Sequence, residues 1–491
     1  MNALLERFLA HASTRPEQAA LIMGSGATTT YGELAARSGR RAVELERSGI
    51  HAGDIVLVAR GVSPALYETL LALFRLGAVA MFPEPAAGLS GVRHAVRAAG
   101  PAGLIGGWPV RVLQPFIAEL RALANLPKRP ATASAAPPKA RNDRRVRADG
   151  PVVATAAESP ALMTFTSGST GQPKGIVRSV EFLLLQHELL ERIRHTQPDD
   201  VDLISLPVFI LSNLAAGATS VIPAGRLSRP SKLDGRRLRE QMVRHQVTRL
   251  VAPPAVCERV VRAEGPALPS IKAVFTGGGP VFSNLLHALH KAMPQAAIHA
   301  VYGSTEAEPI AAIRFDEIKA TDFEAMARGG GLLAGHPIPE AQVRVEDDEL
   351  WVSGPHVNPG YLDPADDRHT KVHDGAQLWH RTGDAVRVDT QGRLWLLGRL
   401  CATADGLYPF AFEAAALGWP GVRQAALLVD GERRWLALAG ERLDMELLRN
   451  LAQPLGEVTV VAVRTVPMDK RHNSKVDYPR LRQLLAHTPN R

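Results

Sequence analysis

Helix-like and strand-like segments alternate along much of this 491-residue chain. Hydrophobic periodicity predicts helices over residues 31–48 and 63–76 and strands over 54–60 and 78–82. Alternation of this kind predicts a largely parallel sheet covered by helices. The scheme continues with strand-like runs, separated by helix-length stretches, at residues 161–166, 201–206, 218–223, 249–253, 273–276 and 298–302. The expected class is therefore α/β, with a large domain of helix-covered sheets.

The pattern changes at Gln342, where short alternating strands begin, as in VRVEDDELWVSG and AVRVDTQGRLWLLG. Alternation with period two and a DTQG turn predicts a β-subdomain. Residues 400–491 can form a small α/β domain, with helices near 412–417 and 445–452 and strands near 425–429 and 458–463. We therefore expect a large domain at 1–399, interrupted by a loop at about 126–150, and a small domain at 400–491.

Charge and cysteine content limit the cellular setting and the partners. Much of the net charge of +8 lies in Lys128–Arg147, KRPATASAAPPKARNDRRVR, a composition typical of a disordered, solvated loop. An RNA-binding or anionic-lipid patch is the alternative, but no aromatic residues are interleaved with the charge, so we expect no nucleic-acid partner. Cys257 and Cys401 fit neither a disulfide framework nor a metal spacing. With no apolar run of signal-peptide or membrane-spanning length near the start, we expect a cytoplasmic protein with no integral membrane segment.

The segment TFTSGSTGQPKG, Thr164–Gly175, is the strongest functional signal. It continues an apolar strand and offers backbone N–H groups, hydroxyls and one ammonium, which suit a polyphosphate. Its spacing differs from the Walker pattern. A flexible Gly/Ser turn is the alternative, but three glycines with Pro173 and Lys174 at this spacing argue against it. The expected phosphate-binding residues are Thr166, Ser167, Gly168, Ser169, Thr170, Gly171 and Lys174.

At this loop the chain resembles the adenylate-forming superfamily of acyl-CoA synthetases, peptide-synthetase adenylation domains and luciferases. The resemblance runs along almost the whole chain. It implies a ligase that uses ATP and Mg²⁺ to activate a small-molecule carboxylic acid as an acyl-AMP. It also implies that the small C-terminal domain is mobile and swings about a hinge between the two half-reactions.

A second matching segment is VYGSTEAEP, Val301–Pro309, placed at the C-terminal end of a predicted strand, where open α/β sheets bind ligands. The resemblance implies that Tyr302 stacks on adenine and that Glu306 is the magnesium ligand, a suitable hard oxygen donor. Outside this motif Glu306 would be an ordinary surface acid. Upstream, FTGGGPV allows close backbone approach to the nucleotide. The further nucleotide-binding residues expected in these two segments are Gly278, Gly279, Gly303, Ser304 and Thr305.

Two later segments complete the expected site. In HRTGDAVRVDTQGRLWLLGR, Asp384 is expected to accept hydrogen bonds from the ribose hydroxyls and Arg399 to donate to the sugar or a phosphate. In VPMDKRHNSKVDYPRL, Lys475 stands where the family carries its mobile catalytic lysine. A flexible ammonium can follow charge from the carboxylate to the α-phosphate. Lys475, Glu306 and Thr166 are the expected catalytic residues.

The second half-reaction is less clearly specified. Ile210 follows Phe209 where acyl-CoA synthetases often carry an aromatic–His pair, and Cys401 stands where the hinge usually has Asp or Lys. Together with YGSTEAEP and RHNSK, these departures resemble the olefin-pathway β-lactone synthetases and related fatty-acyl ligases, whose β-hydroxy acyl adenylate closes on its own hydroxyl. The first alternative is a thioester ligase, with CoA or an acyl carrier protein as acceptor. An acyl carrier protein or a pathway enzyme is the macromolecular partner that we expect. The second is a non-catalytic nucleotide-binding regulator, which would be expected to lose the lysine and the acid.

Overall fold

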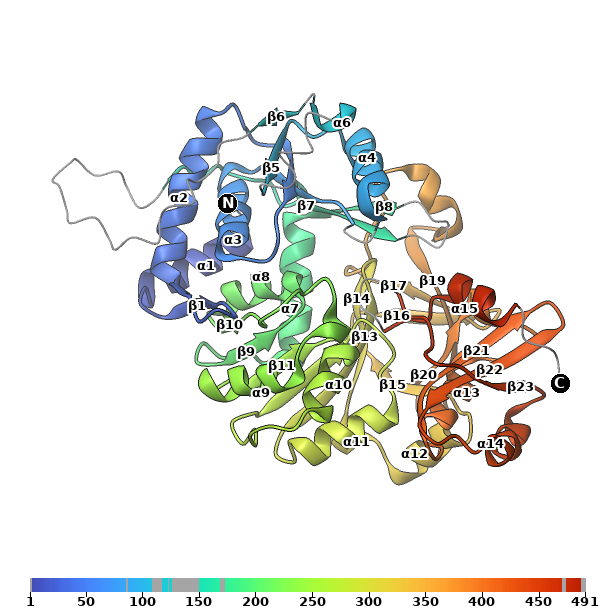
Figure 1. Ribbon diagram of the computed structural model, residues 1–491. Helices are drawn as coiled ribbons and strands as arrows, with labels where there is room; N and C mark the ends of the chain where they lie inside the picture. Colours follow the sequence, from blue (N-terminus) through green and yellow to red (C-terminus); the bar gives the residue numbers. More distant parts are fainter. Residues whose placement is uncertain are drawn as a thin grey trace. The chain divides into compact units, whose positions relative to one another are not determined.

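The structure is a computed structural model that describes residues 2–84, 87–107, 117–121, 123–125, 150–167, 173–469 and 474–486. The chain divides into two compact units (Figure 1). Unit 1 comprises Met1–Asp200, Pro207–Ile222 and Asn358–Asp367, and unit 2 comprises Val201–Leu206, Pro223–Val357 and Arg368–Arg491. All but the last residue of the expected basic loop lies outside the described residues. The domain boundary at residue 399 stays a prediction.

Unit 1 is built around a sheet in the order β6-β5-β3-β4-β7-β8, parallel except for the antiparallel pair β7–β8. A smaller group pairs β10 with β1 and β1 with β2. Local sequence sets the helix limits: Thr30 and Glu33 form a capping box before α2, and α3 ends at Gly77 in the left-handed region. The elements are α1 (Ala3–Thr14), β1 (Ala19–Ile22), β2 (Thr28–Thr30), α2 (Tyr31–Arg47), β3 (Ile55–Ala59), α3 (Pro64–Leu76), β4 (Val79–Phe82), α4 (Gly88–Ala99), β5 (Gly103–Gly106), α6 (Ala118–Arg121), β6 (Ala124–Asn125), β7 (Pro160–Ser167), β8 (Pro173–Ser179), α7 (Val180–Arg194), α8 (Pro207–Ala216) and β10 (Thr219–Val221).

Unit 2 combines a parallel run, β9-β11-β12-β13, with an antiparallel continuation, β14-β15-β20-β19-β17-β16, in which β18 also pairs with β19. Its elements up to residue 399 are β9 (Val201–Ile204), α9 (Gly235–Arg244), β11 (Arg249–Ala252), α10 (Pro254–Arg262), β12 (Ala273–Gly277), α11 (Ser283–Ala292), β13 (Ala297–Ser304), β14 (Ala307–Arg314), α12 (Ala320–Ala327), β15 (Leu332–Pro337), β16 (Gln342–Glu346), β17 (Glu349–Ser353), β18 (Lys371–Asp374), β19 (Gln377–Val388) and β20 (Leu394–Arg399).

The C-terminal residues of unit 2 form a separate three-stranded sheet in the order β21-β22-β23. Alternate strand residues enter two cores: Leu427 and Leu436 pack in one, and Leu428 and Trp435 in the other. Burial on both faces explains why the central residues of β21 and β22 are apolar, and helices cover them. The elements are α13 (Pro409–Ala416), β21 (Val422–Asp430), β22 (Arg433–Gly440), α14 (Met445–Ala452), β23 (Thr459–Ala462) and α15 (Tyr478–Leu485).

The expected fold class is confirmed, and the early elements begin and end within two residues of the expected limits. The strand expected at residues 298–302 is present as β13, which extends two residues further, to Ser304, and turns directly into β14. Strands β8 and β22 and helix α15 were not anticipated. Strand β8 was missed because it follows the glycine loop directly, and β22 was missed because only a short turn separates it from β21.

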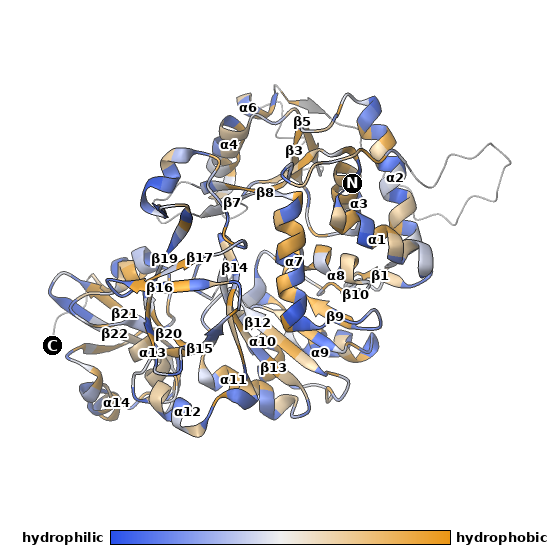
Figure 2. Ribbon diagram, turned by 180° about the vertical axis from the view of Figure 1, so that it is seen from behind, coloured by the Kyte–Doolittle hydropathy of each residue, from blue (hydrophilic) through white to orange (hydrophobic). Residues whose placement is uncertain are grey.

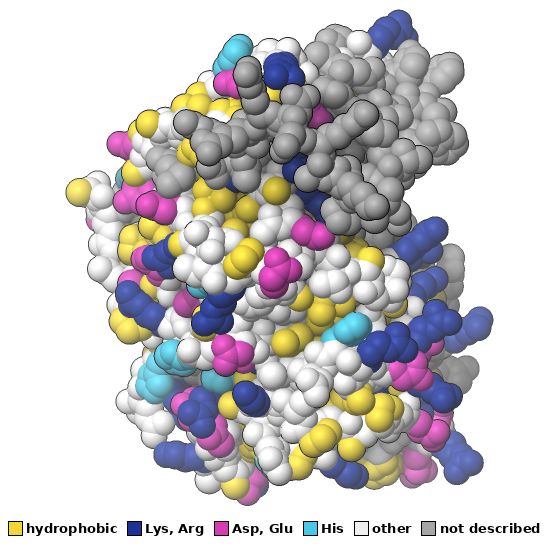
Figure 3. Space-filling model, turned by 90° about the vertical axis from the view of Figure 1, so that its left-hand side faces the viewer, with side chains coloured by type: hydrophobic (Ala, Val, Ile, Leu, Met, Phe, Trp, Pro, Cys, Tyr) yellow, Lys and Arg dark blue, Asp and Glu magenta, His cyan; other side chains and the backbone are white. Residues whose placement is uncertain are grey.

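The described residues have a largely apolar interior, and the face shown in Figure 3 carries charges of both signs. Helix α7 carries both hydrophobic and hydrophilic residues in Figure 2, and its buried residues include Phe182, Leu183 and Leu190. On the face shown in Figure 3, acidic side chains are interspersed among Lys and Arg, so the charge there is mixed. No described helix is both long and apolar enough to cross a membrane.

Candidate active site

In unit 1 the phosphate-binding candidates lie on the β7–β8 hairpin. Thr166 is paired with Lys174 and Ser167 with Pro173, so the antiparallel register places the side chains of Thr166 and Lys174 on the same face. The sequence predicted only the strand that precedes the glycine-rich connection, so the pairing with β8 is a finding of the structure. Gly168, Ser169, Thr170 and Gly171 lie outside the described residues.

Lys174 makes contacts within unit 1. Its Nζ lies 3.7 Å from Asp366 Oδ1 and donates to the Asp366 carbonyl oxygen at 3.4 Å. The ammonium also lies 4.9 Å from the centre of the Tyr361 ring. With a side chain only 10% exposed, Lys174 is held by long, weak contacts that a phosphate group could replace.

In unit 2 three expected residues meet through their side chains. The Tyr302 hydroxyl donates to Asp384 Oδ2 at 2.7 Å, and Arg399 Nη1 donates to Asp384 Oδ1 at 2.8 Å. Burial, with help from the Asp384 carboxylate, raises the pKa of the Tyr302 hydroxyl well above its usual value, so Tyr302 remains the donor. The Asp384 charge raises the pKa of Arg399 as well. Each carboxylate oxygen keeps a further lone pair, so Asp384 can still accept from ribose hydroxyls.

The strand register explains how distant residues converge. Asp384 on β19 is paired with Arg399 on β20. Tyr302 reaches them from β13, although it is 82 residues from Asp384 in the chain. This trio therefore depends on the order of strands in the sheet, which local sequence does not specify.

Glu306 lies in a tight turn. Ser304 is paired with Ala307, so Thr305 and Glu306 form the two-residue connection between β13 and β14. The Ser304 hydroxyl accepts from the Ala307 N–H at 3.2 Å and supports the turn. Glu306 is half-buried, and the short hairpin turn fixes the backbone position from which its side chain extends.

Sequence reasoning missed His380, which is buried close to the expected site. Burial lowers the pKa of His380 to about 4; Lys371 acts in the same direction, while Glu306 and Asp384 oppose it. His380 is therefore neutral at physiological pH. Its position in HRTGD was the available signal, because it precedes Asp384 by four residues.

The glycine turn after β12 lies against the loop that carries Lys475. Gly278 adopts φ +75°, a conformation that favours glycine. A Cβ added at Gly279 would overlap the Cβ of Ser474 and lie 3.1 Å from its Oγ. Lys475 itself is exposed, and its backbone N–H donates to Asp469 Oδ1 at 2.8 Å. The structure thus brings the Lys475 segment close to one of the expected nucleotide-binding glycines.

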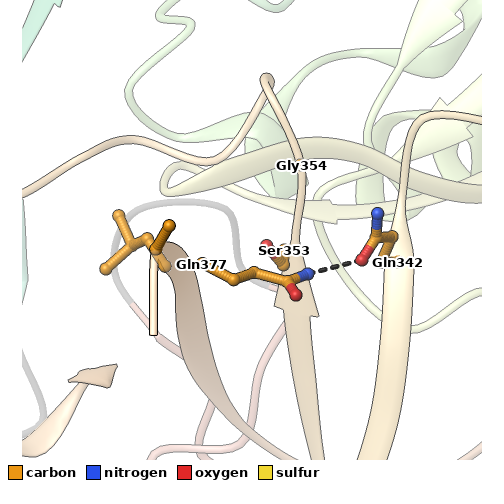
Figure 4. A pocket seen from close by; sticks show the side chains of 6 residues that line it. Gln342, Ser353, Gly354 and Gln377 are labelled. Carbon is orange, nitrogen blue, oxygen red and sulfur yellow. Dashed lines mark hydrogen bonds between the residues drawn. The ribbon is translucent and has the colours of Figure 1, made fainter. Parts of the chain in front are cut away.

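The pocket drawn in Figure 4 is a different feature. It has a volume of about 400 Å³ and is lined by Gln342, Ser353, Gly354, Ala376, Gln377 and Leu378. The Gln377 amide donates to the Gln342 side-chain oxygen across it. None of its lining residues belongs to the expected site, so it does not contribute to the chemistry described above.

Comparison with known proteins identifies the family. A model described as "AMP-binding enzyme" matches residues 8–362. The chain belongs to the AMP-binding enzyme family. It is 30% identical to an olefin beta-lactone synthetase of Xanthomonas campestris pv. campestris, over 96% of this chain and 95% of that protein. It is 28% identical to an indoleacetate–CoA ligase of Aromatoleum aromaticum, over 83% and 81% of the two chains.

Solved structures agree with the fold of an AMP-binding enzyme. ATP-bound MatB from Rhodopseudomonas palustris gives a TM-score of 0.80 at 22% identity, covering 99% of each chain. The amide bond synthetase McbA from Marinactinospora thermotolerans gives 0.78 at 22% identity, covering 98% of this chain and 99% of that one. The family match and the curated relatives confirm the expected superfamily and enzyme class: the chain is an ATP-dependent, AMP-forming ligase. The roles of individual site residues stay predictions.

Proposed function

We propose that this ligase activates a fatty or β-hydroxy fatty acid as its acyl-AMP and then closes a β-hydroxy acyl-AMP to a β-lactone. The observation that carries the proposal is the 30% identity to an olefin beta-lactone synthetase along nearly the whole of both chains. The activation step follows from the family. The nature of the acid and the second step are the parts that need testing.

In the first step a carboxylate oxygen attacks the α-phosphorus of ATP, a new P–O bond forms, and the bond to the bridging oxygen breaks to release pyrophosphate. Thr166 and Lys174 would hold the departing phosphates, and Asp384 and Arg399 the ribose. Lys475 would neutralise charge that develops between the carboxylate and the α-phosphate. This division of roles needs positioning and charge but no covalent enzyme intermediate.

Magnesium fits the residues that are present. Among the described residues no group of three or more His, Cys, Asp or Glu could hold a metal ion. Mg²⁺ commonly needs only one or two protein carboxylates when substrate phosphates supply its other ligands. Glu306, half-buried in the β13–β14 turn, would supply that carboxylate. The ion would supply charge neutralisation on the phosphate oxygens.

The surroundings of Ile210 favour an internal acceptor over a thiol. Ile210 is apolar, fully buried and lies on α8. The residues that follow it in α8 are hydrogen-bonded to α7: Ser212 Oγ lies 2.7 Å from His187 Nδ1, and Arg194 donates to Asn213 Oδ1 at 2.5 Å. The histidine of the aromatic–His pair could exchange a proton and act as a polar gate for a thiol acceptor, whereas a buried isoleucine at this position cannot.

A substrate that carries its own nucleophile does not need such a gate. In the second step the β-hydroxyl oxygen attacks the acyl carbon, the bond from that carbon to AMP breaks, and the hydroxyl proton leaves to solvent. AMP departs as the anion. An intramolecular hydroxyl held near the acyl carbon has a high effective concentration. The product is the acid less one water.

A thioester ligase is the second candidate, favoured by the similarity to an indoleacetate–CoA ligase over 83% of this chain. Here CoA or an acyl carrier protein would accept the acyl group. The two functions share the adenylate and differ only in the nucleophile that consumes it.

The test is product analysis by mass spectrometry, with matched β-hydroxy and plain fatty acids, ATP and Mg²⁺, with and without CoA. The proposal predicts that β-hydroxy acids release AMP and give a product lighter by one water without CoA, while plain acids stall as bound acyl-AMP. Rapid turnover of plain acids on adding CoA, with no dehydrated product from β-hydroxy acids, would instead establish the thioester ligase.

A further inference from the structure

The segment around Lys475 is closed at its base by backbone pairing. Met468 and Val476 form an antiparallel bridge, and the Asp477 N–H donates to the Pro467 carbonyl oxygen at 2.9 Å. Helix α15 begins at Tyr478, with Asp477 as its N-cap. Lys475 therefore directly precedes the paired residue Val476 and lies three residues before a helix.

Asp469 holds the Lys475 backbone from both sides. Its Oδ1 accepts the Ser474 N–H at 2.9 Å and the Lys475 N–H at 2.8 Å. Its own N–H donates to the Lys475 carbonyl oxygen at 2.7 Å. The backbone N–H and the backbone carbonyl of Lys475 are thus both hydrogen-bonded to Asp469. We call Asp469, Ser474 and Lys475 the lysine clamp.

The lysine clamp lies against the expected nucleotide site through Ser474. Ser474 is buried, and its Cβ occupies the space that any side chain at Gly279 would need. Lys475, the next residue, is exposed. Ser474 consequently sets how close the clamp lies to the glycine turn, while the exposed side chain of Lys475 extends from a fixed backbone.

We propose that Asp469 is a positioning residue for Lys475 in the adenylation half-reaction. This inference rests on the proposed role of Lys475. A long lysine side chain can stabilise the α-phosphate only if its Cα starts from a defined point, since its own four-carbon stem is flexible. The charged Asp469 oxygen makes two hydrogen bonds to backbone amides, which are stronger than neutral ones, and so defines that point.

The test compares Asp469→Ala, Asp469→Asn, Lys475→Ala and the double variant Asp469→Ala/Lys475→Ala in ATP–pyrophosphate exchange. We expect Asp469→Ala to slow exchange about 10- to 100-fold, as misplacement of a catalytic group does, with the KM for ATP nearly unchanged. Asp469→Asn should recover most of the rate because its amide oxygen still accepts both N–H groups. The double variant should be no slower than Lys475→Ala.

A second measurement separates positioning from folding. Each variant is given the chemically prepared β-hydroxy acyl-AMP, and release of AMP is followed together with thermal unfolding. If folded Asp469→Ala releases AMP from the acyl-AMP at the wild-type rate, the inference is supported. Equal loss in both half-reactions, or wild-type exchange by Asp469→Ala beside an inactive Lys475→Ala, would overturn it. Wild-type exchange by Lys475→Ala would instead remove the proposed role of Lys475, on which the clamp depends.

Discussion

Glu413→Gln should stabilise the C-terminal part of the chain at neutral and alkaline pH. Glu413 lies on α13, is 2% exposed, and accepts the Leu427 N–H at 3.2 Å. Burial raises the pKa of Glu413 from 4.5 to about 8. Glutamine keeps the acceptor oxygen and nearly the same shape but cannot ionise.

The magnitude follows from linkage. Between pH 4.5 and about 8 the folded chain keeps a proton on Glu413 that the unfolded chain releases, so the free energy of unfolding falls as pH rises through this window. Each pH unit costs about 1.4 kcal/mol. The cost of the carboxyl group is therefore about 3 kcal/mol at pH 7 and about 5 kcal/mol above pH 8.

Native-state hydrogen exchange of amides in β21 and β22 would measure this locally, at pH values from 5 to 9. The protection of Glu413→Gln relative to wild type should grow with pH and level off above pH 8. Glu432→Gln, an exposed change in the turn between the same strands, is the matched control and should follow wild type. Parallel pH profiles for wild type and Glu413→Gln would refute the reasoning.

Three further variants test the expected site. Glu306→Gln should lower the apparent affinity for Mg²⁺ about tenfold or more without changing thermal unfolding, because a neutral amide holds a hard cation poorly; an unchanged magnesium titration would remove Glu306 from the site. Gly279→Ala should slow pyrophosphate exchange, and adding Ser474→Gly should restore much of the rate by removing the overlapping Cβ. The control Gly61→Ala, at an exposed position with open space around it, should leave the exchange rate unchanged. A double variant as slow as Gly279→Ala alone would contradict this explanation. Asp384→Asn should raise the KM for ATP about tenfold at nearly constant affinity for the acid, measured by initial rates, because the side chain that pairs with Arg399 and is proposed to accept from the ribose loses its charge. Equal changes in the KM of both substrates would indicate general distortion.

Local sequence predicted the elements that carry the site but not how they meet. Glycine and apolar patterns placed the expected phosphate-binding loop after β7 and the glycine turn after β12, because each depends only on neighbouring residues. The hydrogen bond from Tyr302 to Asp384 depends on strand order, which no short pattern encodes. The turn at Glu306 was missed because VYGSTEAEP was interpreted as the end of a strand, whereas its last residues begin β14. Asp469 carried no signal, since its role lies in bonds to residues five and six positions later.

Isotope transfer from the substrate carboxyl group tests the central claim most directly. A β-hydroxy fatty acid with ¹⁸O in both carboxyl oxygens and an unlabelled hydroxyl is converted with ATP and Mg²⁺, and AMP and the dehydrated product are analysed by mass spectrometry. Activation at the carboxyl group followed by internal closure predicts one ¹⁸O in AMP and one in the lactone carbonyl, with an unlabelled ring oxygen. AMP without label, or a lactone that keeps both labels, would contradict the account.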